Sequence, residues 1–357
     1  MSTNKKQIYT SDLYSYEHLQ VIADIIIHDN KSDDKMDILL RKMFDSEKLI
    51  GNDDPDAIDT IERLLRRNMP RRTVIAVKTR WAMKFNNNVL RKLPKTRSVI
   101  LLLTPDSYDP FFMCGEQLSL EKNVVSHVFI THAESIRTFE KMGGIESTLL
   151  PIGICINTWW TRIKIYVASS DSRRILFMNF TNKYNRNVHV SPCIKERFVA
   201  QEALLRNGFV MHPSCDFDKM IAIMSTFKFV ACPPAIGQDT HRFWEALSCG
   251  CAVVLNDWEV LRRSHRGLLP ALFVRSKLNK ECDCNYCCLC AINIKHNTDN
   301  TDIFIDQFGD FFVQGWSGVT YRVLTLLHRF IGWKRSSSHI EKITSASYWI
   351  CRVRSYC

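Results

Sequence analysis

The residues best suited to chemistry lie in one short segment of the C-terminal half, residues 237–250. Gly237 permits a close backbone approach in a loop, and Asp239 or Thr240 can cap a helix that begins directly afterwards. The first turn of such a helix presents N–H groups and the positive end of the helix dipole. This combination suits a bound phosphate.

Three charged or titratable side chains would share one face of that helix. Glu245 follows Arg242 by three residues and His241 by four, which is the spacing of neighbours on a helix surface. His241 and Arg242 can donate charge-assisted hydrogen bonds to a phosphate, each contributing roughly 1.5–3 kcal/mol. Glu245 can accept hydrogen bonds from ribose hydroxyls, and Gly250 would end the helix. The segment therefore predicts a site for a nucleoside diphosphate.

Each of these residues also has a purely structural interpretation. His241 can cap the helix or have another structural role, and Arg242 can form an ion pair with Asp239 or Glu245. Glu245 would then be an ordinary surface carboxylate. We prefer nucleotide binding because the order, the spacing and the expected secondary structure all agree with it.

The segment resembles the nucleotide-sugar-binding stretch of GT-B glycosyltransferases, and within them the exostosin-like branch with its viral and microbial relatives. Members of that branch share a strand, two prolines, a Gly–Asp/Thr–His–Arg run, the sequence W-E-A-L, a small-residue turn and an apolar strand. The resemblance implies that Glu245 binds the ribose, and that His241 and Arg242 lie near the diphosphate. The matching positions are Pro233, Pro234, Gly237, Asp239, Thr240, His241, Arg242, Trp244, Glu245, Ala246, Leu247 and Gly250.

A weaker resemblance extends over residues 72–275. Residues 176–186 are similar to the strand and polar loop in which family members hold the diphosphate. The first 60 residues and residues 280–312 have no counterpart in the family. A solvated basic loop is the alternative interpretation for the two cations of the polar loop. The positions that would face the diphosphate there are Asn179, Lys183 and Arg186.

The resemblance implies an enzyme with two Rossmann-like domains that transfers a hexosyl or pentosyl group. Its donor would be a nucleoside-diphosphate sugar, and its acceptor a hydroxyl group of a glycan, a protein or a small molecule. Transferases of this kind usually work without a bound metal. No cofactor is therefore expected besides the donor itself.

An inverting transferase also needs a carboxylate or histidine that deprotonates the acceptor hydroxyl. The candidates at the ends of expected strands in the N-terminal domain are Asp106, Asp109 and His132. A retaining enzyme needs no such base, because the donor's own phosphate can take the proton. The sequence leaves both courses open.

Charge is unevenly distributed along the chain. Residues 1–60 carry 13 acidic and 7 basic residues, whereas the whole chain has a net charge of +11. The basic remainder could attract nucleic acid, an acidic membrane or a phosphorylated small molecule. The rival hypothesis is a catalytically silent GT-B-fold module that binds nucleic acid or protein through its basic surface, although nucleic acid is not the favoured partner.

The apolar runs and the cysteines of the sequence indicate in which cellular compartment the protein is expected. The N-terminus has no secretory signal, and no apolar run approaches the ~20 residues of a membrane span. We therefore expect a cytoplasmic protein with no membrane span and mostly reduced thiols. Five cysteines crowd residues 282–290 and could bind a soft metal. A second pair of ligands downstream is missing, so an oxidisable loop without metal is the favoured interpretation.

These residues need an α/β scaffold to hold them. Strands alternating with helices predict parallel, doubly wound sheets. Two such series in tandem predict two Rossmann-like domains facing a cleft, with ligands at the carboxyl ends of the strands. Expected strands are 72–78, 98–103, 125–131, 174–180, 209–212, 227–232 and 251–256, and expected helices are 134–142, 194–207, 219–226 and 241–248.

The predicted organisation has five parts. The first is an acidic helical extension with an apolar stripe formed by Leu19, Val21, Ile22, Ile25 and Ile26. An acceptor domain, a nucleotide-sugar domain, a cysteine-rich and loop-like insertion, and C-terminal helices that pack back across the domain junction follow in that order. The predicted limits are 1–60, 61–165, 166–275, 276–312 and 313–357.

Overall fold

The structure is a computed structural model, and contacts divide the chain into two compact units. Unit 1 comprises Met1–Ala133, Arg137–Ile156 and Ser347–Cys357, and unit 2 comprises Glu134–Ile136 and Asn157–Ala346. The residues that the structure describes are 23–28, 49–51, 55–68, 71–96, 98–104, 120–130, 144–150, 174–180, 192–234, 239–265, 267–275, 294–295, 303–305, 309–335 and 351–356.

Unit 1 is built on a six-stranded sheet in the order β2-β1-β3-β4-β5-β6, and every neighbouring pair is parallel. The run Val99–Leu103 is completely buried, as expected for a strand of a parallel sheet. The strands are β1 (Ile25–His28), β2 (Leu49–Gly51), β3 (Thr73–Lys78), β4 (Val99–Thr104), β5 (Val125–Ile130) and β6 (Ser147–Leu149). The helices are α3 (Ala57–Arg67), α4 (Thr79–Asn88) and the 3-10 turn η1 (Leu90–Lys92).

The helical N-terminal extension predicted from the sequence is wrong where the structure describes it. Ile25, Ile26 and Ile27 form β1, which lies between β2 and β3 and is buried. Three consecutive β-branched residues favour a strand. A strand inside a parallel sheet buries both of its faces, whereas the predicted helical stripe would bury only one. Residues 1–22 and 29–48 lie outside the described residues.

Unit 2 is built on a seven-stranded sheet in the order β11-β12-β13-β10-β9-β8-β7. Five strands, β7 to β10 and β13, pair in parallel, while β12 and β11 add an antiparallel edge. The loop-like character predicted for the insertion is therefore wrong at β11 and β12. The strands are β7 (Arg174–Phe177), β8 (Phe227–Ala231), β9 (Ala252–Asn256), β10 (Ala271–Arg275), β11 (Ile294–Lys295), β12 (Ile303–Ile305) and β13 (Phe311–Gln314).

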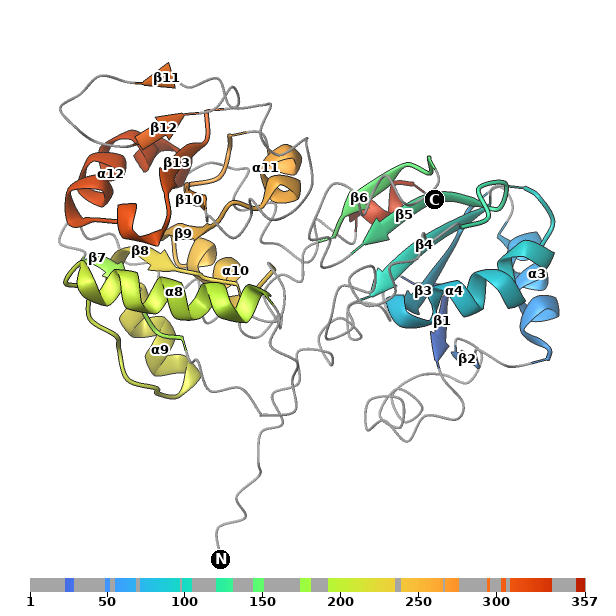
Figure 1. The fold of residues 1–357 in the computed structure, drawn as a ribbon. Helices are drawn as coiled ribbons and strands as arrows, with labels where there is room; N and C mark the ends of the chain where they lie inside the picture. The colour runs from blue at the N-terminus through green and yellow to red at the C-terminus, as the bar shows by residue number, and fades with distance from the viewer. Residues whose placement is uncertain are drawn as a thin grey trace, which may run out of the picture. The chain divides into compact units, whose positions relative to one another are not determined.

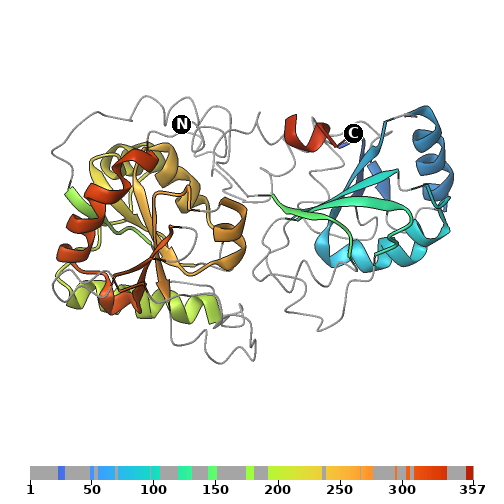
Figure 2. The ribbon, with the colours of Figure 1, turned by 90° about the horizontal axis from the view of Figure 1, so that it is seen from above.

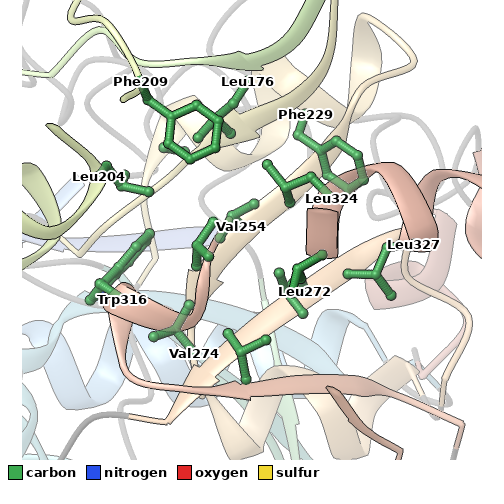
Figure 3. Packing of buried hydrophobic residues seen from close by; sticks show 14 of the residues in the cluster. Leu176, Leu204, Phe209, Phe229, Val254, Leu272, Val274, Trp316, Leu324 and Leu327 are labelled. Atoms are coloured by element: carbon green, nitrogen blue, oxygen red, sulfur yellow. The ribbon is translucent and has the colours of Figure 1, made fainter. Parts of the chain in front are cut away.

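Helices cover both faces of this sheet. On one face, α8 (Pro192–Arg206), α12 (Tyr321–Arg335) and the 3-10 turn η3 (Trp316–Gly318) enclose a core with the strands (Figure 3). The helices α9 (Phe217–Met224), α10 (His241–Ser248) and α11 (Glu259–His265) contribute no residue to that core. Of these, α9 contacts β8, and α10 contacts β8 and β9. Core residues labelled in the figure include Leu176, Leu204, Phe229, Val254, Leu272, Trp316 and Leu324.

Both sheets share one order of connection. Met211 forms an isolated parallel bridge with Met178, just beyond β7, so the segment between α8 and α9 extends the sheet on the far side of β7. The predicted strand 209–212 is reduced to this bridge. In unit 2, the first strand along the chain, β7, lies between the segment at Met211, which comes second, and β8, which comes third. In unit 1, β1 lies in the same way between β2 and β3. In doubly wound sheets, ligands bind outside the carboxyl ends of the strands where this order reverses, which here lies between β7 and β8.

Helix ends in unit 2 follow local sequence signals. Gly208 and Gly250 have φ angles of 82° and 68°, and each lies just beyond a helix that it was predicted to end. Asp216 caps α9, because its Oδ1 accepts a hydrogen bond from the Lys219 backbone nitrogen at 2.8 Å. These local signals mark the ends of α8 and α10 and the start of α9.

The C-terminal residues belong to unit 1. Residues 351–356 lie beside its sheet in both views (Figures 1 and 2). Arg354 Nη1 lies 3.1 Å from Asp24 Oδ1. The Tyr356 ring packs against His127 in a tilted arrangement, with 4.2 Å between the ring centroids. The chain thus returns to its first unit at its end.

Candidate functional site

A pocket of about 270 Å³ lies where the strand order of unit 2 reverses. Residues after β7 and β8, the helix α8, the segment after Met211 and the first turn of α10 line it. Ligand pockets span about 300–1,000 Å³, so these walls accommodate part of a sugar nucleotide. The lining residues are Asn179, Phe180, Arg197, His212, Ser214, Ala231, Cys232, Pro233 and Arg242.

Two prolines end β8 and begin the loop toward α10. Cys232 still pairs with β9, since its backbone nitrogen donates to the Val254 carbonyl at 2.8 Å, but Pro233 and Pro234 have no N–H to donate. Both prolines are buried, so their carbonyl oxygens need donors. Arg197 Nε donates to Pro234 O at 3.0 Å, and Arg197 Nη2 donates to Pro233 O at 3.3 Å. The loop is therefore attached to α8.

Asn179, directly after β7, fixes the opposite wall. Its Nδ2 donates to the carbonyl oxygens of His212 at 3.3 Å and of Pro213 at 2.8 Å. Two such bonds use both N–H groups of the amide. In this arrangement Asn179 positions the wall, and its predicted contact with a diphosphate stays a prediction.

The ring of His212, in the same wall of the pocket, packs against two aromatic side chains. Its ring centroid lies 5.0 Å from that of Phe177 and 5.1 Å from that of Phe227. Partial burial lowers the pKa of His212 below its usual 6.5, and the nearby Arg174 lowers it further. The ring is therefore neutral at pH 7 and offers one donor and one acceptor nitrogen.

The N-terminus of α10 has its predicted start but not its predicted cap. Thr240 occupies the N-cap position with an extended backbone, and its side chain makes no capping hydrogen bond. Its hydroxyl is buried and has no hydrogen-bond partner among the described residues. Asp239 instead accepts a hydrogen bond from Trp244 Nε1 at 2.7 Å. The Thr240 hydroxyl and the start of α10 together suit a phosphate.

Arg242 and Glu245 form an ion pair on the first turns of α10. Arg242 Nε lies 3.2 Å from Glu245 Oε2, and the side chains are 22% and 8% exposed. The structural interpretation was thus right about the pairing but wrong in taking Glu245 for a surface carboxylate. Arg242 Nη1 is buried and makes no hydrogen bond within the described part of the chain. Since Arg242 lines the pocket, a phosphate bound there would accept from its remaining N–H groups.

The thiol of Cys232 interacts electrostatically with both pocket arginines, Arg242 and Arg197. Burial raises its pKa far above the usual value, an effect that Arg242 and Arg197 oppose only weakly. The sulfur therefore stays protonated and acts as a small apolar part of the wall. It is not a nucleophile in this site.

The structure brings some of the predicted residues together and leaves others outside its described part. At the start of α10 and across the pocket from it lie Asp239, Thr240, His241, Arg242, Glu245 and Asn179. Outside the described residues lie the predicted catalytic Asp106, Asp109 and His132 and the predicted donor-binding Gly237, Lys183 and Arg186. The roles of that second group stay predictions.

Arg197 and His212 were missed by the sequence analysis. The signal for Arg197 was only general, because the carbonyl oxygens of any buried loop after a strand need a donor. Which residue supplies it depends on the packing of α8, which a weakly periodic helix does not reveal. His212 ends the predicted strand 209–212, so the rule that sites follow strand ends would have found it.

Two features of the structure concern membrane spans and metal sites. None of the helices it describes is both long and apolar enough to cross a membrane. Within the ranges given above, no three His, Cys, Asp or Glu side chains are grouped to hold a metal ion. The cysteine-rich segment 282–290 lies outside those ranges.

Comparison with known proteins adds little to this geometry. No protein-family model matches the chain, and no curated protein matches it. Among solved structures, the one described as "Crystal structure of GtfA/B complex" matches with a TM-score of 0.30 and 9% sequence identity. The match covers 84% of this chain and 59% of that chain, so this chain spans well under two thirds of its length. A similarity this distant establishes neither a family nor a function.

Proposed function

We propose that this chain is a glycosyltransferase that binds a nucleoside-diphosphate sugar in the pocket of unit 2 and transfers the sugar to an acceptor hydroxyl. The observation that carries the proposal is the place and lining of the pocket. It lies at the reversal point between β7 and β8, with Arg242 and the start of α10 on its wall. The assignment to the exostosin-like branch is the finer part of the proposal and rests on the sequence of residues 233–250.

Positive groups at this wall suit the charge that develops during transfer. When the bond between the sugar and the phosphate breaks, negative charge grows on the departing nucleoside diphosphate, and preorganised donors stabilise it. Arg242 lines the pocket and is the donor there, and the buried Thr240 hydroxyl at the N-cap of α10 is a second candidate donor. Glu245 is held by Arg242 through one carboxylate oxygen, which supports a role of the other oxygen toward ribose hydroxyls.

The transfer also requires a group that takes the proton of the acceptor hydroxyl. As the acceptor oxygen bonds to the sugar, its proton passes to a base in an inverting enzyme or to the departing phosphate in a retaining one. We propose Asp106, Asp109 or His132 for the first case. The acceptor itself, a glycan, a protein or a small molecule, is left open.

A transfer assay tests the proposal. The purified chain is incubated with a panel of nucleoside-diphosphate sugars and mixed acceptors, while free nucleoside diphosphate and acceptor mass are followed. We expect turnover with one donor, reduced about 10²–10³-fold in Arg242→Met, the usual cost of removing one transition-state donor. Arg263→Met is the control, because Arg263 pairs with Glu259 at 2.6 Å on the surface of α11.

Two results would contradict it. Absence of turnover with every donor in a folded sample would remove the enzymatic part. Binding to nucleic acid that weakens steeply with salt, without selectivity for a nucleotide, would favour a catalytically silent binding module instead.

A further inference from the structure

We propose that Arg197 is a positioning residue of the nucleotide pocket, which holds the Pro233–Pro234 loop and thereby sets where α10 presents its donors. The inference rests on the proposed nucleotide-binding function for its ligand. The attachment of the loop to α8, however, can be measured without any ligand.

The carbonyl oxygens of two adjacent prolines need hydrogen-bond donors, because both residues are buried. Pro233 and Pro234 have no N–H of their own to pair with a neighbouring strand. Arg197 reaches both oxygens at once, at 3.3 Å and 3.0 Å. The planar, forked guanidinium donates in two fixed directions, whereas the ammonium group of lysine has three donors but no fixed fork geometry.

The position of Arg197 is itself fixed by its neighbours. The preceding residue, Glu196, accepts a buried hydrogen bond from Asn256 Nδ2 at 2.9 Å, at the end of β9. The Arg197 guanidinium also lies over the Phe180 ring, 5.6 Å from its centroid, just after β7. Two consecutive residues of α8 thus connect this helix to the ends of β7, β8 and β9.

The loop that Arg197 holds leads directly to the phosphate-facing end of α10. Pro234 precedes Thr240 by six positions, and Asp239 is held from the helix side by Trp244 Nε1. Arg197 fixes the start of this connection and Trp244 fixes its end. We therefore expect a shift of the prolines to change the position of the first turn of α10, including the pocket residue Arg242.

The test compares three variants of the full chain. Arg197→Met removes both hydrogen bonds at similar length, and Arg197→Lys keeps the charge. Arg206→Met is the matched control, because Arg206 lies on the exposed face of the same helix and pairs with Glu202 at 3.1 Å. Amide hydrogen exchange of peptides within residues 232–244 is measured without ligand, and the affinities for inorganic pyrophosphate and nucleoside diphosphates are measured beside it.

We expect faster exchange over residues 232–244 in Arg197→Met, and affinity for the bound nucleotide weakened at least about tenfold, since each charge-assisted hydrogen bond is worth roughly that factor. Arg197→Lys should fall between Arg197→Met and the wild type, and Arg206→Met should match the wild type. If Arg197→Met fails to fold, the lysine variant carries the comparison.

The outcomes separate the two proposals. Unchanged exchange over residues 232–244 would show that Arg197 does not hold the loop. Faster exchange with unchanged nucleotide affinity would make Arg197 a stabilising residue only, and would also overturn the inference. If the wild type binds no nucleotide, the proposed function fails, and the exchange data alone decide whether Arg197 fixes the loop.

Discussion

Asp239 shows at the residue scale how a matched sequence position can serve the fold. It occupies the Gly–Asp/Thr–His–Arg run of the family, yet its carboxylate accepts the indole N–H of the fully buried Trp244 at 2.7 Å. Asp239→Ala leaves that buried donor unpaired, which costs about 1–3 kcal/mol of unfolding free energy. Asp239→Asn keeps an acceptor and should cost clearly less. Urea unfolding of both variants checks this, and equal losses would contradict the role.

Two buried or half-buried histidines predict how stability depends on pH. Burial lowers the pKa of both His212 and His127 below 6.5. The nearby Arg174 lowers the pKa of His212 further. At His127, Glu146 opposes the effect of burial, whereas Arg352 and Arg72 add to it. As the pH falls through about 6.5, the unfolded chain takes up protons that the folded chain refuses, so stability falls. The same groups contribute nothing to the slope at higher pH.

Urea unfolding between about pH 7.5 and pH 5 measures that slope. We expect the unfolding free energy of the wild type to decrease toward pH 5, and the decrease to be smaller in His127→Gln and in His212→Gln. The two histidines belong to different units, so each substitution should act on its own unit. A pH dependence identical in both variants and the wild type would contradict this assignment.

What the sequence reveals of the site follows from the range of the interactions. The spacing of Arg242 and Glu245 on one helix is a local property, and it offered their pairing as one of the alternatives. The burial of Glu245 and the bond from Arg197 to the proline carbonyls depend on contacts between distant segments. No local pattern encodes those contacts.

At the scale of elements, β1 offers a direct test of the corrected N-terminal region. Ile26 is 1% exposed in a strand with neighbours on both sides. Ile26→Ala should therefore cost about 2–5 kcal/mol, as large-to-small changes in a core do. Val210→Ala, at a residue that is 72% exposed, is the control and should stay within about 0.5 kcal/mol. A small effect of Ile26→Ala on the urea midpoint would argue for a surface position.

Elements with strong local signals were predicted well, and those that depend on their neighbours were not. The apolar runs of β3, β4, β5, β8 and β9 match expected strands closely, because strands buried on both faces need continuous apolar sequence. The short strands β11 and β12 depend on their partners, since β12 pairs with β13 and β11 pairs with β12, and β1 was obscured by its helix-like spacing. Pairing partners of this kind are not visible in one sequence.

At the scale of the whole molecule, the C-terminal residues 351–356 are expected to stabilise unit 1. Besides the Arg354–Asp24 pair, Arg72 Nη1 donates to the Tyr356 carbonyl at 3.1 Å, and the Tyr356 ring meets Phe129 edge-on at 5.4 Å. Removing residues 351–357 should speed amide exchange in β3 and β5 and leave unit 2 unchanged. Cys351→Ser, on the exposed side of the same segment, is the control. Unchanged exchange in β3 and β5 would contradict this role.

The two parallel sheets follow from the alternation of strands and helices, which the sequence carries plainly. The packing of the C-terminal helices across the junction stays a prediction, and residues 351–356 belong to unit 1 and contact Asp24 there. Which strands they meet depends on side chains such as Asp24 and His127, from segments far away in the chain. The predicted domain limits remain predictions.

Thermal unfolding with and without nucleoside diphosphates tests the central claim, that the pocket between β7 and β8 binds the donor. A ligand at about a hundred times its dissociation constant adds roughly 2.7 kcal/mol, a shift of about 5–10 °C for a unit of this size. We predict such a shift with one nucleoside diphosphate in the wild type and in Arg263→Met, and its loss in Arg242→Met and Glu245→Ala. No shift with any nucleotide, or a full shift in Arg242→Met, would contradict the claim.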